Sequence, residues 1–111
     1  MGKHERIFKT LAGKTLEVKA FGETYSTVFS LAQYRDDGEV AVSLVLVEDG
    51  EPFCTLTCCI PRTVLSENEI LVKTWSENEE IAKAALASGY FKDTGKRVST
   101  GFVQAQIWEV L

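Results

Sequence analysis

Residues 40–60 read VAVSLVLVEDGEPFCTLTCCI, the most strongly β-forming stretch of this 111-residue chain. Both alternating faces of residues 40–48 are largely apolar, which is typical of a central strand covered on each side. Asp49 and Gly50 then form a tight-turn signal. Residues 53–60 follow as a second strand, which ends before a proline because proline cannot donate a ladder hydrogen bond. The stretch predicts an antiparallel β-hairpin.

Two further strands and a short helix precede this hairpin. Residues 26–34 lead into a second Asp-Gly turn at 36–38, so they are expected to pair with residues 40–48 and complete a three-stranded meander. Residues 15–21 also alternate and predict another strand. Residues 7–13 have the apolar spacing of one helical turn, which is too short to be stable unless it docks on the sheet. The inward-facing side chains of the 15–21 strand are predicted to be Leu16, Val18 and Ala20.

The C-terminal half predicts one helix between two strands, at residues 69–75 and 102–110. Ser76 and Glu79 have the spacing of a capping box, in which the Ser76 hydroxyl accepts from the Glu79 N–H and the Glu79 carboxylate reaches back. A glycine at position 89 is a common helix stop. The helix is therefore expected at residues 77–88. Its buried stripe is expected to contain Ile81, Ala82, Ala85 and Leu86.

Together these elements predict a single α+β domain over residues 1–111, with an antiparallel β-meander sheet of about five to six strands and one main α-helix packed on one face. The second face of the sheet needs cover, which either the N-terminal segment or a second copy of the chain would supply. A homodimer is therefore one expected arrangement. The alternative fold is a small, partly open β-barrel capped by the helix.

The composition indicates a globular protein of the cytoplasm. The net charge of −4 disfavours a general polyanion binder. No apolar run reaches the roughly 18 residues of a membrane span, and the charged start does not resemble a secretion signal. Cys54 and Cys58 lie about 13 Å apart along one predicted strand, too far for a disulfide, and reduced thiols fit a cytoplasmic location.

The sequence contains no recognisable catalytic or metal-binding motif. A nucleophilic cysteine needs a base, and the only histidine is His4 at the terminus. The Cys54-x-x-x-Cys58-Cys59 spacing lacks the further ligands of a zinc site. Most acidic side chains occupy turns and the start of the helix. We therefore expect a protein that is not an enzyme and that has no cofactor and no metal.

Residues 92–101 are the most promising binding segment, because they combine three cations with hydroxyl side chains and two glycines. A loop of this kind can hold a phosphate, and neighbouring aromatic rings can stack on a base. The competing interpretation is a solvated connection whose aromatic residues anchor it to the core. The candidate binding residues are Tyr90, Phe91, Lys92, Thr94, Lys96 and Arg97.

Two segments carry a resemblance to a known group of proteins. They are residues 49–57, a stretch that ends at Ile60 and Pro61, and residues 94–102. Together they resemble an uncharacterised family, described as plasmid-related or as a domain of unknown function, that is encoded on bacterial plasmids and conjugative elements. The resemblance implies a cytoplasmic accessory protein of a mobile element, and it implies no activity.

Two main functions compete on these observations, and a thiol-dependent enzyme using Cys54, Cys58 or Cys59 is a third hypothesis. The first is a non-enzymatic binding or regulatory protein that acts on a protein partner, because the chain is acidic, lacks catalytic groups and forms a sheet whose edges can pair with another strand. The alternative is a nucleic-acid-binding protein that uses the cationic segment at residues 92–97. Neither hypothesis involves binding to a membrane.

Overall fold

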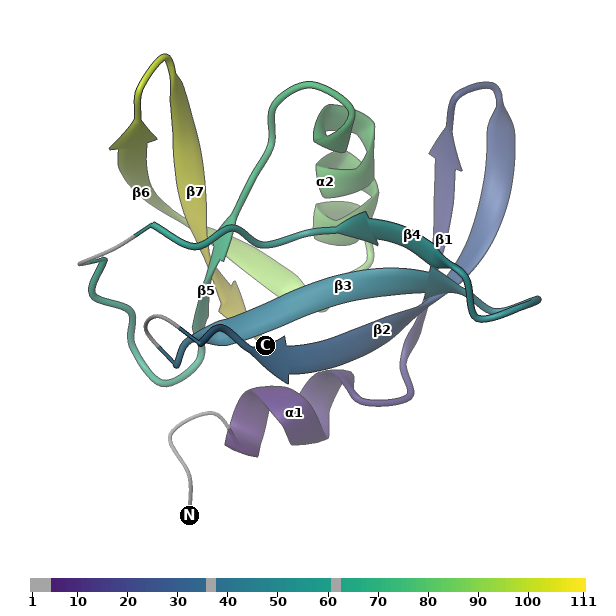
Figure 1. Ribbon diagram of the computed structural model, residues 1–111, viewed down its shortest axis with the longest axis horizontal. Coiled ribbons are helices and arrows are strands. Elements are labelled where there is room, and N and C mark those ends of the chain that lie inside the picture. Colours follow the sequence, from purple (N-terminus) through teal and green to yellow (C-terminus); the bar gives the residue numbers. More distant parts are fainter. Residues whose placement is uncertain (1–4, 36–37, 61–62) are drawn as a thin grey trace.

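Two antiparallel sheets form the framework of the protein (Figure 1). The computed structural model describes residues 5–35, 38–60 and 63–111, and within them the chain forms two helices and seven strands. The first sheet has the order β1-β2-β3-β4 and the second the order β5-β7-β6. The α+β class is confirmed, although two sheets replace the single sheet predicted. The elements are α1 Glu5–Leu11, β1 Thr15–Ala20, β2 Glu23–Gln33, β3 Val40–Leu46, β4 Pro52–Thr55, β5 Glu69–Val72, α2 Asn78–Ala87, β6 Phe91–Thr100 and β7 Val103–Val110.

The first sheet is the predicted meander, extended by β1 to four strands. Its first hairpin turns at Phe21 and Gly22, whose φ angles of 55° and 78° are those of a type I′ turn between the paired residues Ala20 and Glu23. Positive φ is unusual for phenylalanine, so the exposed Phe21 side chain sits on a strained backbone. Of the second predicted turn, residues 36 and 37 lie outside the described residues.

The fourth strand is shorter than predicted because the chain leaves the first sheet after Thr55. The Leu56 N–H still donates to the Val42 carbonyl at 2.8 Å, but Thr57 already pairs with Val72 of the second sheet. The Cys58 N–H then donates to the Leu71 carbonyl at 3.0 Å. Residues 56–58 therefore connect the two sheets instead of extending β4 to Ile60.

The segment at residues 92–101 is not a loop, contrary to our prediction. It forms most of β6, which pairs with β7 from Phe91 opposite Val110 to Thr100 opposite Val103. The pairing is interrupted by a bulge between Asp93 and Arg97. Gly95 allows this bulge because its φ of 86° is accessible to glycine without strain.

Helix α2 lies close to its predicted position, but its capping box is absent. Glu77 is the N-cap and makes no side-chain cap bond. Ser76 has a φ of 55° and uses its carbonyl, not its hydroxyl, to accept from the Glu79 N–H at 3.2 Å. The Glu79 carboxylate instead pairs with Lys83 at 3.6 Å. Gly89, with a φ of 87°, ends the helix as predicted.

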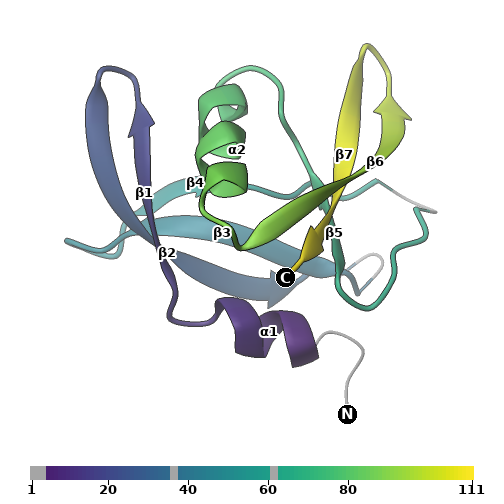
Figure 2. The ribbon, with the colours of Figure 1, turned by 180° about the vertical axis from the view of Figure 1, so that it is seen from behind.

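Helix α2 lies between the β1–β2 and β6–β7 hairpins, which extend on the same side of the molecule (Figures 1 and 2). Its buried residues join a main core that also contains the fully buried Trp108 and the predicted inward face of β1. Along β3, Val42 and Leu44 are buried whereas Ser43 and Val45 are only half-buried. Neither described helix has the length and apolar run that a membrane crossing requires. The buried residues of α2 are Asn78, Ile81, Ala82 and Ala85, and those of β1 are Leu16, Val18 and Ala20.

Candidate functional site

The two aromatic residues of the predicted site belong largely to the core. Phe91 is 4% exposed, and its ring packs 5.8 Å from Phe29 and 5.5 Å from Trp108. Tyr90 is half-buried, and its hydroxyl donates to the Thr15 carbonyl at 3.2 Å. Both residues anchor the segment to the core, as the competing interpretation predicted, but the segment is a strand and not a solvated connection. Because Phe91 is enclosed by protein, its ring is not accessible for stacking on a base.

Lys96 is neutralised by a carboxylate from the neighbouring strand β5. Its Nζ lies 2.6 Å from Glu69 Oε2, and the Glu69 side chain is only 8% exposed. Glu69 also accepts the Ser66 N–H at 2.8 Å. Burial raises the pKa of Glu69, but the bonds from Lys96 and Ser66 outweigh it and hold the pKa below its ordinary value. This pair was not predictable from the sequence, because the two residues lie 27 positions apart.

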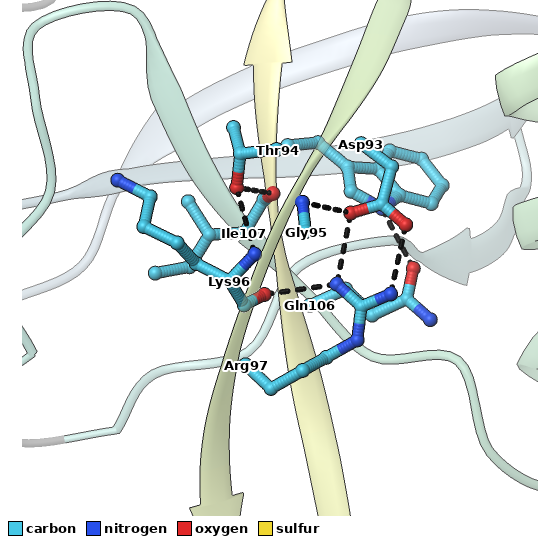
Figure 3. A network of polar contacts seen from close by, with 8 residues as sticks. Asp93, Thr94, Gly95, Lys96, Arg97, Gln106 and Ile107 are labelled. Carbon is cyan, nitrogen blue, oxygen red and sulfur yellow. Dashed lines mark hydrogen bonds and ion pairs between the residues drawn. The ribbon is translucent and has the colours of Figure 1, made fainter.

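Arg97 is held by an acid within the bulge itself (Figure 3). Its guanidinium donates to the two Asp93 carboxylate oxygens at 2.8 and 2.9 Å, and to the Lys96 carbonyl at 2.9 Å. The hydrogen bond from Arg97 is the main cause of the lowered pKa of Asp93. Thr94 turns its hydroxyl to the Ile107 carbonyl at 2.6 Å. Asp93, Thr94 and Arg97 therefore all have hydrogen-bond partners within the fold.

The structure brings Thr94, Lys96 and Arg97 together but gives each a protein partner. Lys92 is exposed and faces away from the core, opposite Glu109 in the β6–β7 register. A phosphate at this bulge would have to compete with two carboxylates that are already in place. The geometry consequently disfavours the predicted phosphate site.

We expect the protein not to retard DNA or RNA in an electrophoretic shift assay at low salt. Nucleic-acid affinity depends on cations that release counterions from phosphates, and two of the three cations of this segment are paired. Single- and double-stranded probes of both kinds should migrate unchanged at micromolar protein. A shift abolished in the Lys96→Ala/Arg97→Ala variant would restore the nucleic-acid hypothesis.

The surroundings of Cys54 and Cys58 are those of structural cysteines. Cys54 is half-buried beside the main core, and burial raises its pKa to about 11, although Lys73 lowers it slightly. Burial also raises the pKa of Cys58. Neither thiol is in a disulfide, as predicted. A raised thiol pKa is the opposite of what a nucleophilic cysteine requires.

At pH 8 we expect iodoacetamide to alkylate Cys54 about 10- to 100-fold more slowly than an unperturbed thiol. A rise in pKa from 9.0 to about 11 reduces the thiolate fraction about 100-fold, and the higher nucleophilicity of the more basic thiolate offsets part of that loss. Peptide mass spectrometry after timed quenching measures the rate at this position. The same reaction in concentrated urea provides the control and should proceed at the ordinary rate. Equal rates in the folded and unfolded protein would contradict the burial of this thiol.

A groove lies between β1 and α2. It has a volume of about 640 Å³. Helix α2 contributes a stripe of polar and small residues that recur three to four positions apart. This stripe runs beside the stripe of buried residues on the same helix. The helix residues of the groove are Glu80, Lys83, Ala84 and Ala87, and those of β1 are Thr15, Leu16, Glu17 and Lys19.

The β1 side of this groove is an open sheet edge. The Phe29 N–H donates to the Lys14 carbonyl, which makes residues 14 and 29 a hydrogen-bonded pair. Because such pairs alternate along an antiparallel ladder, the even-numbered residues of β1 bond to β2. The N–H and C=O groups of Glu17 and Lys19 therefore point away from β2, and within the described ranges no strand pairs with that edge.

Sequence reasoning missed this groove, although two of its signals were available. The alternation of β1 marked one exposed face, and residues 80, 83, 84 and 87 formed a second helical stripe. The sequence did not show that α2 packs beside β1, because the two elements lie some 60 residues apart along the chain.

The fold and this groove define a small α+β protein with an open, helix-flanked sheet edge. Searches for relatives of the chain found no matching protein family, curated protein or solved structure.

Proposed function

We propose that this chain is a non-enzymatic binding or regulatory protein whose partner is another protein, bound in the groove between β1 and α2. The observation that carries this proposal is the row of outward-facing backbone groups of Glu17 and Lys19, which lines a concave surface instead of lying on a convex one. Exposed sheet edges next to a helix are a common way to bind extended segments of other proteins.

The charged groups whose pKa values are shifted support a binding role over a catalytic one. Glu69 and Asp93 are each paired with a cation inside the fold, and both carboxyl pKa values are lowered. A general acid or base at neutral pH needs a pKa shifted toward 7 instead. The described residues also contain no cluster of three potential metal ligands.

We place this protein in the cytoplasm as an accessory protein of a mobile element. The cytoplasmic setting is supported by the unpaired thiols of Cys54 and Cys58. The mobile-element setting depends on the resemblance carried by residues 49–61 and 94–102. A small acidic protein with a peptide-sized groove suits a role in which it captures or blocks another protein.

Site-specific photocrosslinking tests the proposal in cells of the organism that encodes the chain. A photoreactive phenylalanine analogue replaces Ala84 in the groove or, as the control, Val64, which is 88% exposed in the loop before β5. We expect irradiation to give a discrete protein adduct from position 84 and none from position 64. Adducts from neither position, or equal adducts from both, would reject the groove as the binding surface.

A further inference from the structure

We infer that the partner presents a short, extended and basic segment, which adds to the open edge of β1 as a further strand and places a lysine or arginine at the Phe21 end of the groove. This inference depends on the proposed function and gives its ligand a chemical class. Three features carry it, namely the limited length of the open edge, the small side chains of α2 and the charge around Phe21.

The open edge is bounded at both ends by side chains that already satisfy the backbone. At one end, the Tyr90 hydroxyl donates to the Thr15 carbonyl at 3.2 Å. At the other, the Phe21 N–H donates to Glu80 Oε2 at 3.4 Å. Between them, Glu17 and Lys19 each direct one N–H and one C=O outward. A segment of about four residues in extended conformation can pair with these four groups.

The α2 side of the groove leaves room for the side chains of such a segment. Ala84 and Ala87 are the smallest side chains of the helix stripe, and Leu16 of β1 also lines the groove. Alternate side chains of an added strand project toward α2, whereas the others project to solvent. An apolar or β-branched residue therefore fits above the alanines.

The Phe21 end of the groove is strongly acidic. Two smaller hollows continue the groove around the β1–β2 turn and the start of α2. Phe21 is 59% exposed there, so a cation can contact its ring as well as the carboxylates. The groove and these hollows contain five glutamates, Glu17, Glu23, Glu77, Glu79 and Glu80, but only two lysines, Lys19 and Lys83.

One of these two lysines is already paired, since Lys83 lies 3.6 Å from Glu79. The remaining charge is therefore clearly negative. An acidic segment or a nucleic acid would be repelled by this surface, whereas a basic segment is attracted to it. Charge thus selects the basic segment among the strands that the edge can accept.

Selection of a random twelve-residue peptide library displayed on phage, with the purified chain as bait, tests the inference. We expect the enriched peptides to share one lysine or arginine and to carry β-branched or apolar residues at alternating positions. Free synthetic copies then give dissociation constants by calorimetry. N-methylation of the peptide nitrogens that bond to β1 should weaken binding about 10- to 100-fold, while methylation of the intervening ones has little effect.

Two pairs of protein variants separate backbone pairing from charge. Lys19→Pro removes an outward N–H without touching the β1–β2 ladder and should weaken binding about 10-fold or more, whereas Lys19→Ala should not weaken it. Glu77→Lys should weaken binding about 10-fold at low salt, and Glu67→Lys, which lies outside the groove, should not. Thermal unfolding of each variant verifies that it is folded.

The possible failures are distinguishable. Peptides that bind equally well to Lys19→Pro would overturn strand addition, and enrichment of acidic peptides, or of none, would overturn the basic class. In each case an adduct from position 84 would still support the proposed function. A chain that sediments as a dimer dissociated by Lys19→Pro would show that a second copy occupies the edge, and it would overturn the inference.

Discussion

Replacement of Trp108 by alanine is expected to lower the free energy of unfolding by about 3–5 kcal/mol, as for other buried aromatic side chains. The indole is fully buried and contacts the Phe91 ring at 5.5 Å between centroids. Its N–H also donates to Gln106 Oε1 at 2.9 Å. Domains of this size have total stabilities of about 5–15 kcal/mol, so the variant should be near the limit of folding.

Urea titration followed by circular dichroism measures this effect, since the variant loses one of its two tryptophans as a fluorescent probe. Phe102→Ala is the matched control. Phe102 is an aromatic residue near the same strand, in the β6–β7 turn, and it is fully exposed, so its loss should change stability by less than about 0.5 kcal/mol. A Trp108→Ala effect below about 1 kcal/mol would mean that the main core is not organised around this side chain.

The strands of the first sheet were predictable because local signals agreed with one another. Alternation marked the buried face of β1, and an Asp-Gly turn marked the β3–β4 connection. Helix α2 was equally clear from its apolar spacing and from Gly89. The N-cap was not, because Ser76 adopts a positive φ instead of the extended conformation of an N-cap residue, and the helix begins after Glu77 without a side-chain cap bond.

The division into two sheets was not predictable, because it depends on long-range hydrogen bonds. Residues 53–60 have the composition of one strand, yet Thr57 and Cys58 bond to β5. The strand β6 was missed for a different reason. Its bulge contains Asp93, Gly95 and Lys96, and these residue types are depleted in strands and common in loops.

The same limit applies to the site. The cations at positions 96 and 97 suggested a binding loop, but charge in a sequence does not show which partners the fold supplies. Asp93 and Arg97 are close along the chain, whereas Glu69 reaches Lys96 only because β5 and β6 flank the same strand β7. The groove likewise exists only once α2 packs beside β1.

Loss of the Lys96 ammonium is expected to destabilise the protein by about 1–2 kcal/mol at pH 7. Lys96→Ala leaves the buried Glu69 carboxylate without its 2.6 Å partner, which carries the cost of an unsatisfied buried acceptor. The expected destabilisation is at the low end of what an unsatisfied buried acceptor usually costs. Lys96 is itself 55% exposed, so water replaces part of its interaction with Glu69. Lys92→Ala removes an exposed lysine from the same strand and should cost less than about 0.5 kcal/mol.

The difference in unfolding free energy between the wild-type protein and Lys96→Ala depends on pH, and this dependence identifies Glu69 as the partner of Lys96. The folded pKa of Glu69 lies below its ordinary value of 4.5, so the pair contributes stability above that pH and loses it as the pH falls through the folded pKa. The gap between the wild-type protein and Lys96→Ala should therefore be constant from pH 7 to about pH 5 and should close below pH 4.5. Asp93 also titrates at low pH, but it does so in both proteins and cancels in the comparison. Urea titrations at pH 7, 5 and 3 measure the gap, and a gap at pH 3 as large as at pH 7 would mean that Lys96 stabilises β6 through its alkyl chain and not through Glu69.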